Sequence, residues 1–202
     1  SYPRAAYDLP KLRARFDKEI AEGRESTLRQ DAELLAIDAE KLESAPSPNS
    51  SLTEWIVAGE TTAFLSLRSE SYAYMGGAHG EGGYGALLWD KATDAPIESA
   101  ASLFKDELAG LRKNYCEALE TEKKRVRGVD GPDPIGEKCP EYNELSVLLT
   151  GAAGEKFSAV QLIANPYVTG SFAEGAYTIT LPLTPASLDQ VKPEVRDQFV
   201  EK

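Results

Sequence analysis

The first part of the chain carries a helical pattern of apolar residues. Five of them are separated by four, three, four and three positions: Leu28, Ala32, Leu35, Ala39 and Leu42. This spacing places them on one face of a helix. Pro10 suits the first turn of such a helix, and the run "SAPSPNSS" after Glu43 cannot continue it. We therefore expect a helix from Pro10 to about Glu43.

Later segments alternate between apolar and polar residues, which is typical of half-buried strands. "LTEWIVAGE", "TAFLSLRSESYAYM" and "YGALLWD" predict three strands, and "LSVLLTG", "EKFSAVQLIAN" and "AYTITLPL" predict three more. Between these groups, residues 103–127 place apolar side chains on one helical face, which predicts a second long helix. Pro185 and Pro193 each suit the start of a short helix near the end of the chain.

The order helix, three strands, helix, three strands predicts an α+β fold, with a mainly antiparallel sheet and long helices packed on one of its faces. We expect a single compact domain over residues 1–202, built from two adjoining parts. The first part covers about 8–95 and the second about 96–190, each with one helix and three strands. A short C-terminal helix completes the prediction.

The net charge of −11 and the pI of about 4.7 narrow the choice of partners. Nucleic acid is excluded, because its phosphates would be repelled. A basic protein partner fits the charge, and so does simple solubility. The sequence contains no apolar run of the length that a transmembrane helix needs. Because the chain starts at Ser1 rather than Met, we expect a signal peptide or anchor segment to have been removed.

Cys116 and Cys139 are the only cysteines, with 22 residues between them. A disulfide between them would constrain the unfolded chain by about 3.5 kcal/mol on the loop-entropy estimate. Two buried thiols in a cytoplasmic protein fit the same count. Composition leaves both alternatives open.

The stretch "YMGGAHGEGGYG" contains the only histidine, His79, and a G-x-G-x-x-G at residues 80–85. A dinucleotide site requires a helix directly after these glycines, and a short strand and turn follow instead. One histidine and two distant cysteines make no zinc cluster. The loop that holds Asp130, Asp133 and Glu137 lacks the ligand spacing of an EF-hand. We therefore predict no metal and no cofactor.

His79 itself supports three interpretations. Its ring can bond a backbone carbonyl and hold the glycine-rich loop in place, or it can contact a ligand or partner. It can also act as an acid or base with hydroxyl or carboxylate side chains of the same segments: Ser69, Ser71, Glu70 and Glu81. No serine lies in a G-x-S-x-G elbow and no Cys–His signature is present, so an enzyme is the less favoured interpretation.

Aromatic residues flank the glycine-rich stretch: Tyr72, Tyr74, Tyr84 and Trp89. Tyrosine and tryptophan offer rigid apolar faces with a polar tip, which suit a sugar ring or a protein cleft. Alternating aromatic residues on strands are equally typical of a core. The pattern alone does not separate the two roles.

Three stretches together resemble a known family: "YAYMGGAHG", "LLWDKATDAPIESAASLF" and "NPYVTGSFAEGAYTITLPLTPASLDQVKPEVR". The chain resembles a bacterial cell-envelope domain family of unknown function. This family includes the extracellular lysozyme-binding domain of the anti-sigma-V factor and the non-catalytic domain of a peptidoglycan deacetylase. The resemblance covers nearly the whole chain. It implies a location in the periplasm or at the outer surface, with a lipid anchor as one arrangement, and it favours a disulfide between Cys116 and Cys139.

The resemblance also implies a site. By motif position, the loops that contact lysozyme in the anti-sigma-V relative match residues 76–83 and 166–174. The predicted binding residues lie in and beside these loops: Tyr74, Gly76, Gly77, His79, Glu81, Tyr84, Pro166, Tyr167, Phe172 and Glu174. We therefore predict a non-catalytic extracytoplasmic domain that binds a cell-wall component such as a peptidoglycan fragment, or a basic wall-cleaving enzyme such as lysozyme. The alternative is a cell-wall-modifying hydrolase that uses His79 as acid or base.

Overall fold

The computed structural model describes residues 1–36, 49–76, 79–128, 138–152 and 154–202. Its elements follow in chain order: η1 (Arg4–Ala6), α1 (Pro10–Leu35), β1 (Ser50–Glu60), β2 (Phe64–Tyr74), β3 (Glu81–Asp90), β4 (Ala95–Ile97), η3 (Ala100–Leu103), η4 (Ala109–Leu111), α2 (Arg112–Arg127), η5 (Tyr142–Glu144), β5 (Ser146–Thr150), β6 (Ala159–Ala164), η6 (Phe172–Glu174), β7 (Tyr177–Pro182), α3 (Pro185–Gln190) and η7 (Pro193–Gln198). The short helices predicted from Pro185 and Pro193 are confirmed. No helix in these described segments is long and apolar enough to cross a bilayer.

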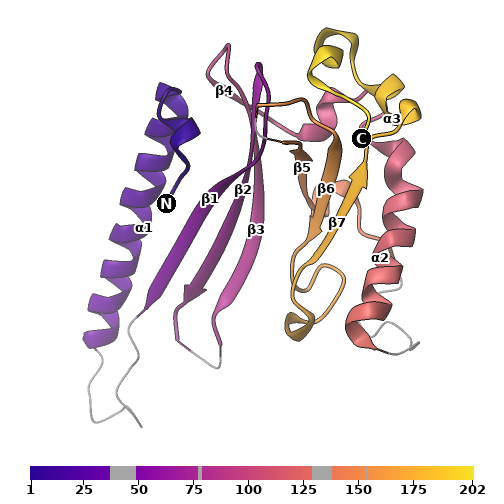
Figure 1. Cartoon of the computed structure of the whole chain (residues 1–202). Helices are drawn as coiled ribbons and strands as arrows, with labels where there is room; N and C mark the ends of the chain where they lie inside the picture. Colours follow the sequence, from indigo (N-terminus) through magenta and orange to yellow (C-terminus); the bar gives the residue numbers. More distant parts are fainter. Residues whose placement is uncertain (37–48, 77–78, 129–137, 153) are drawn as a thin grey trace.

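The strands form two sheets, and every pair of neighbouring strands is antiparallel. One sheet has the order β1-β2-β3-β4 and the other has the order β5-β6-β7. Figure 1 shows α1 along the outer side of the first sheet and α2 along the outer side of the second. The α+β class and the antiparallel pairing are therefore confirmed. The arrangement differs from the expected single sheet with both helices on one face, because each helix covers its own sheet.

Each helix packs on its sheet through a separate group of apolar side chains. The smaller group joins the N-terminal segment and α1 to the outer face of the first sheet: Ala6, Leu9, Leu12, Phe16, Leu65, Leu67, Leu87 and Trp89. The larger group joins α2 to the second sheet and also takes in Phe64 and Leu88 from the inner face of the first sheet. Burial of apolar surface in these two groups is the main stabilising contribution to the fold.

The two sheets meet where the edge of β5 approaches the inner face of the first sheet. The backbone N–H of Leu149 donates to the hydroxyl of Ser66 at 3.2 Å. A Cβ atom on Gly59 would lie only 2.9 Å from the carbonyl oxygen of Leu149, so this approach requires glycine in β1. The N–H of Leu149 points toward Ser66 rather than β6, and β5 therefore contacts the first sheet with its free edge.

The second long helix begins later than the pattern over residues 103–127 predicts. The φ angles of Glu107 and Leu108 are positive, at 50° and 71°, and a right-handed helix does not include such residues. The carboxylate of Asp106 accepts hydrogen bonds from the N–H groups of Leu108 and Gly110 at 3.1 and 2.8 Å. This Asp-centred turn replaces the predicted first turns, and α2 starts after it.

Among the side chains of α1 that the structure describes, those in the first half of the helix pack against the core. Leu12 and Phe16 are buried, whereas Leu28, in the predicted apolar stripe, is 58% exposed. The stripe residues Ala39 and Leu42, and the predicted end at Glu43, lie outside the described residues. Between the second half of α1 and β1 lies a groove of about 440 Å³ whose lining includes Ile20, Leu28 and Leu52.

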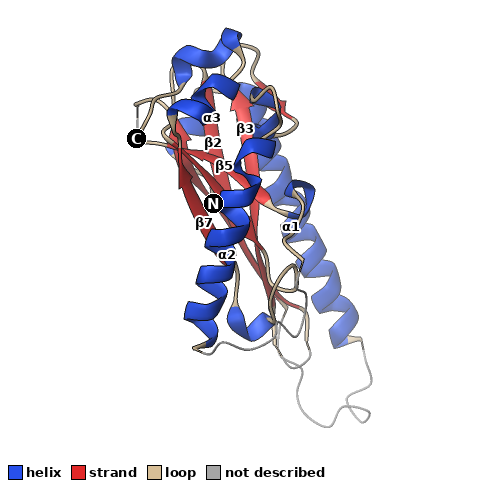
Figure 2. Cartoon of the chain, turned by 90° about the vertical axis from the view of Figure 1, so that its right-hand side faces the viewer, coloured by secondary structure: helices blue, strands red, loops and turns tan. Residues whose placement is uncertain are grey.

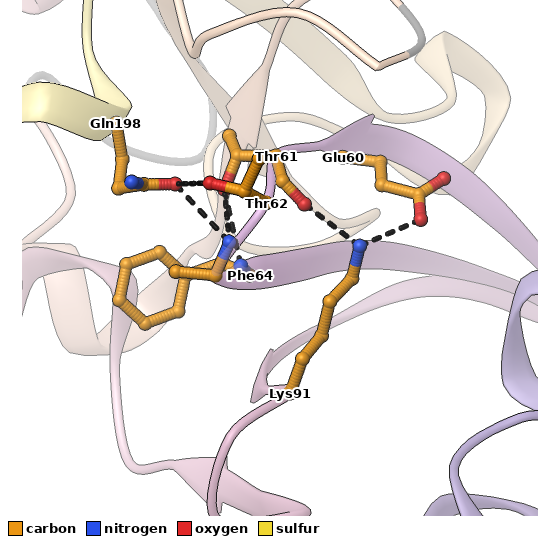
Figure 3. A network of polar contacts seen from close by, with 7 residues as sticks. Glu60, Thr61, Thr62, Phe64, Lys91 and Gln198 are labelled. Carbon is orange, nitrogen blue, oxygen red and sulfur yellow. Dashed lines mark hydrogen bonds and ion pairs between the residues drawn. The ribbon is translucent and has the colours of Figure 1, made fainter.

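Polar contacts hold the β1–β2 turn against the C-terminal segment (Figure 3). The Lys91 ammonium group donates to a Glu60 carboxylate oxygen and to the Thr61 carbonyl, both at 2.7 Å. The Gln198 side-chain oxygen accepts from the Thr62 hydroxyl at 3.0 Å and from the backbone N–H of Ala63. Lys91 and Gln198 therefore connect this turn to β3 and η7.

The disulfide favoured by the resemblance is confirmed. Cys116 in α2 and Cys139 are bonded, with Cα atoms 5.7 Å apart and a sequence separation of 23. The bond ties α2 to the segment that leads into η5 and β5. Figure 2 shows α2 beside this second sheet.

Candidate functional site

The connections between β2 and β3 and between β6 and β7 meet in space. Figure 1 shows both at the same end of the molecule. The imidazole of His79 lies on the ring of Phe172 with centroids 4.4 Å apart and planes 20° from parallel. His79 belongs to the glycine-rich stretch and Phe172 to η6, so the two predicted loops are in contact through these rings.

A third ring extends this contact. The ring of Tyr167 lies 6.0 Å from that of Phe172, with an angle of 28° between the planes. Tyr167 is 61% exposed and Phe172 is half-buried. We call Tyr167, Phe172 and His79 the ring cluster. Stacked aromatic rings at an exposed position give a large rigid contact area at small entropic cost.

Tyr167 has an unusual backbone conformation. Its φ angle is 71°, in the left-handed region that costs a side-chain-bearing residue about 1–2 kcal/mol. The surrounding turn holds it there, since its N–H donates to the carbonyl of Gly170 at 3.0 Å. Strained residues of this kind are often found at binding sites.

His79 is exposed and holds its own loop. Nδ1 lies 2.9 Å from the carbonyl oxygen of Gly80. Because a carbonyl oxygen only accepts, Nδ1 carries the hydrogen and the neutral ring keeps its lone pair on Nε2. The carbonyl-bonded arrangement is one of the three interpretations of His79 that the sequence left open. The hydroxyl of Ser71, a proposed catalytic partner, donates to the carbonyl of Gly83 instead.

Glu174 is surrounded by hydrogen-bond donors. One of its oxygens accepts from the backbone N–H and the hydroxyl of Ser171 at 2.9 and 2.8 Å. The other accepts from the hydroxyl of Tyr177 and from the guanidinium of Arg127, the latter at 2.8 Å. These donors lower the pKa of the Glu174 carboxyl to about 2, with the Tyr177 hydrogen bond as the largest cause. Burial, followed by this same hydrogen bond, raises the pKa of Tyr177 to about 12.

This Glu174 network shapes the second loop from within. The Glu174 side chain is 15% exposed, and its four donors come from η6, β7 and the end of α2. A Cβ on Gly170 would lie 2.7 Å from the Tyr177 ring, and Gly175 has a positive φ of 74°. Glycine is therefore required for close packing at the first position and for backbone conformation at the second. The network makes Glu174 a scaffold for the ring cluster rather than an exposed contact.

Asn165 joins the two connections at their base. Its side-chain oxygen accepts from the backbone N–H of Tyr84 at 2.7 Å, and its side-chain nitrogen donates to the Tyr84 carbonyl at 2.9 Å. The hydroxyl of Ser146 donates to the same carbonyl at 2.7 Å. Sequence reasoning did not single out Asn165, although the Asn-Pro pair at the loop start is a turn signal that marks this position.

The tyrosines around the glycine-rich stretch differ in their exposure and in their contacts. Tyr72 is 47% exposed, and a Cβ on Gly80 would collide with its ring. Tyr74 is half-buried. The ring of Tyr84 lies beneath the guanidinium of Arg68 at 5.5 Å, and burial, with a hydrogen bond from the Tyr84 hydroxyl to Glu70, raises the pKa of Tyr84. Trp89 is not part of this surface, because it is buried under α1.

The other predicted residues border the ring cluster along the chain. Glu81 is exposed at the start of β3, Pro166 is half-buried, and Gly76 has a positive φ of 91° that suits glycine. Gly77 lies outside the described residues. Asp130, Asp133 and Glu137 also fall outside them.

Several cavities of the protein lie away from the ring cluster. Four cavities have volumes of about 440, 620, 270 and 590 Å³, and none of these four is lined by Tyr167, Phe172 or His79. Within the described segments, no group of three or more His, Cys, Asp or Glu side chains is arranged to hold a metal ion. Two residues of the ring cluster, Tyr167 and His79, are exposed to solvent.

Comparison with known proteins gives a family match and several similar solved structures. Residues 1–81 match the family described as deacetylase PdaC. No curated protein matches the chain. A solved DUF3298 family protein from Pseudomonas aeruginosa PAO1 is 20% identical, with a TM-score of 0.55 over 84% of this chain and 72% of that one. A DUF3298 family member from Bacteroides fragilis is 15% identical, with a TM-score of 0.49 over 94% of this chain and 71% of that one.

These matches differ in what they show. The family match covers α1, β1 and β2 and ends at the first residue of β3. The Pseudomonas structure shares the fold of this chain over most of its length. Neither match places a ligand on the ring cluster.

Proposed function

We propose that this chain is a non-catalytic, extracytoplasmic binding domain of the bacterial cell envelope, and that its partner is a basic, wall-cleaving enzyme of the lysozyme type. The observation that carries the proposal is the stacking of His79 on Phe172, which unites the two loops in one exposed surface. The match to deacetylase PdaC and the fold shared with a DUF3298 family protein support a cell-envelope role.

The shape of the surface favours a protein partner over a wall fragment. Small ligands are normally held in concave pockets that bury most of their surface. The ring cluster instead projects from loops, and the four cavities described above are lined by other residues. A partner that supplies its own cleft matches this arrangement, and exposed Tyr167 is the type of residue that anchors such interfaces.

The charge of the chain supports the same partner. A net charge of −11 attracts a basic protein and speeds its association. Exposed Glu81 lies two residues from His79 and adds negative charge beside the ring cluster. Such attraction between surface charges weakens as salt is added.

The disulfide supports the proposed location. Disulfides such as Cys116–Cys139 form and persist mainly in oxidising compartments outside the cytoplasm. Thiol titration of protein purified from the periplasm, in denaturant and without reductant, is expected to find no reactive thiol. Two reactive thiols would contradict this location.

Calorimetric titration with c-type lysozyme at low and moderate salt tests the proposed partner. We expect binding that weakens with salt and that falls by about tenfold in Tyr167→Ala, which corresponds to about 1.4 kcal/mol. Tyr7→Ala is the matched control, because Tyr7 is also an exposed tyrosine, 53% exposed, but lies beside η1. Absence of heat at both salt concentrations would contradict the lysozyme-type partner, and so would equal losses in the two variants.

A further inference from the structure

Asn165 links the β6–β7 connection to β3, the strand that follows His79. Its carbonyl accepts from the N–H of Val168 at 3.1 Å, within the turn that carries Tyr167. Its side chain bonds both backbone groups of Tyr84. Asn165 thereby joins the start of the β6–β7 connection to the strand that follows His79.

The side-chain amide of Asn165 substitutes for a neighbouring strand. The N–H and carbonyl of Tyr84 point to the free edge of β3, away from β2, and an adjacent strand residue would normally pair with them. The amide presents one acceptor and one donor side by side, so it satisfies both groups. The two bonds, at 2.7 and 2.9 Å, fix the position of Asn165 along β3.

That position determines which rings meet. His79 precedes Tyr84 by five residues, and Phe172 follows Asn165 by seven. The four described hydrogen bonds to Glu174 hold the shape of the β6–β7 connection, and none of their donors lies in β2 or β3. The bonds to Tyr84 connect this segment to β3 and set its position along that strand.

We propose that Asn165 is a positioning residue for the binding surface: its amide fixes the β6–β7 connection along β3 and so places Phe172 on His79. For its effect on partner binding, this inference rests on the proposed function. Its structural part is independent of the partner.

Asparagine is the side chain that this role requires. Aspartate keeps the acceptor but loses the donor, so that a carboxylate oxygen would face the Tyr84 carbonyl and repel it. Glutamine would carry the same amide on a side chain one methylene longer. Asn165→Asp is therefore the most specific disruption, because it changes one group and almost no volume.

His79 is the only histidine in the chain, so its ring signals in an NMR spectrum are unambiguous. Stacking on Phe172 places the imidazole protons over an aromatic ring, which shifts them upfield from the positions of a free histidine. In Asn165→Asp we expect these signals to move toward the free positions, while circular dichroism shows a folded protein. Asn143→Asp is the matched control, since Asn143 is exposed and lies in η5. In this control variant, the His79 signals are expected to stay in place.

Asn165→Gln provides a second variant in case Asn165→Asp does not fold. It keeps one donor and one acceptor but carries them on a side chain one methylene longer, so the β6–β7 connection must shift relative to β3 if both bonds to Tyr84 are kept. The expected result is a movement of the His79 signals toward the free positions. Unchanged His79 signals in a folded Asn165→Asp would overturn the inference, as would unchanged signals in Asn165→Gln where Asn165→Asp does not fold.

Lysozyme titration separates this inference from the proposed function. We expect affinity to fall about tenfold in Asn165→Asp and to remain unchanged in Asn143→Asp. If wild-type protein does not bind lysozyme, the proposed partner fails, and the His79 signals still decide the role of Asn165. If wild-type protein binds and Asn165→Asp binds equally well, Asn165 has no positioning role in binding.

Discussion

The two connections of the ring cluster are held in different ways. The β6–β7 connection contains its own scaffold, because Glu174 collects four hydrogen bonds from three elements and keeps Phe172 in place. For the glycine-rich connection between β2 and β3, the described contacts are those of His79 with Gly80 and Phe172 and the packing of Tyr72 over Gly80. Among the described contacts, the β6–β7 side is therefore held by its own hydrogen bonds, and the His79 side is placed by the stacking of its ring on Phe172.

The largest expected effect comes from removal of the disulfide in α2, the helix whose Arg127 bonds Glu174. Replacing Cys116 and Cys139 by serine should lower the free energy of unfolding by about 3 kcal/mol, because the open chain gains entropy in the unfolded state. Urea denaturation measures this loss. Since Arg127 still bonds Glu174, the His79 ring signals should remain upfield, and their loss in the folded variant would show that the ring cluster depends on the disulfide.

Glu174→Gln tests the scaffold itself. We expect a loss of about 2 kcal/mol in the free energy of unfolding, since the amide cannot replace a carboxylate whose pKa is held near 2. Glu141→Gln is a control on an exposed glutamate that pairs with Arg112. An equal and small loss in both variants would contradict the scaffold role.

The lowered pKa of the Glu174 carboxyl group predicts that the free energy of unfolding depends on pH. Its pKa is lowered from 4.5 to about 2 by folding, so its contribution is complete above about pH 4.5 and is lost as the pH falls toward 2. Urea denaturation between pH 5 and pH 2 should show a steeper loss of stability in the wild type than in Glu174→Gln. Parallel pH profiles would contradict the assigned pKa.

Phe172→Ala removes the ring on which His79 rests. Aromatic pairs of this kind contribute about 0.5–1.5 kcal/mol beyond area burial. Hydrogen exchange should therefore speed up in the β2–β3 connection, while the N–H of Ser171, bonded to Glu174, stays protected. Faster exchange on both sides would show that the stack supports the scaffold as well, and the distinction between the two connections would fail.

The smallest expected effect on stability belongs to Tyr167→Asn. Asparagine tolerates positive φ better than tyrosine, so the free energy of unfolding should stay the same or rise by less than about 1 kcal/mol. Lysozyme affinity should nevertheless fall. A clear loss of stability would mean that the Tyr167 ring serves the fold rather than a partner.

The sequence predicted helices and strands well where their formation depends on residues that are close together in the chain. The alternation around Tyr177, Ile179 and Leu181 gave β7, and Pro10 marks the start of α1 as expected. The disulfide followed from the family resemblance. Each of these features depends on a short stretch of chain or on one pair of residues.

Features that depend on distant residues were not predictable in the same way. The division into two sheets depends on Gly59 and Ser66 meeting the edge of β5, more than 80 residues later in the chain. The role of Glu174 depends on Arg127, 47 residues away, whereas the family resemblance placed Glu174 among the predicted binding residues. Asn165 and Tyr84 are 81 residues apart, and the Asn-Pro pair indicates a turn without indicating its partner.

The most direct test of the account is a measurement of nuclear Overhauser effects from the His79 ring protons in wild-type protein. The centroid separation of 4.4 Å predicts strong effects to the ring protons of Phe172 and none to those of Tyr7 beside η1. Because His79 is the only histidine, these effects can be assigned without ambiguity. Effects to Phe172 would establish that the two connections form one surface in solution. Their absence in a folded protein would contradict the ring cluster and the binding surface built on it.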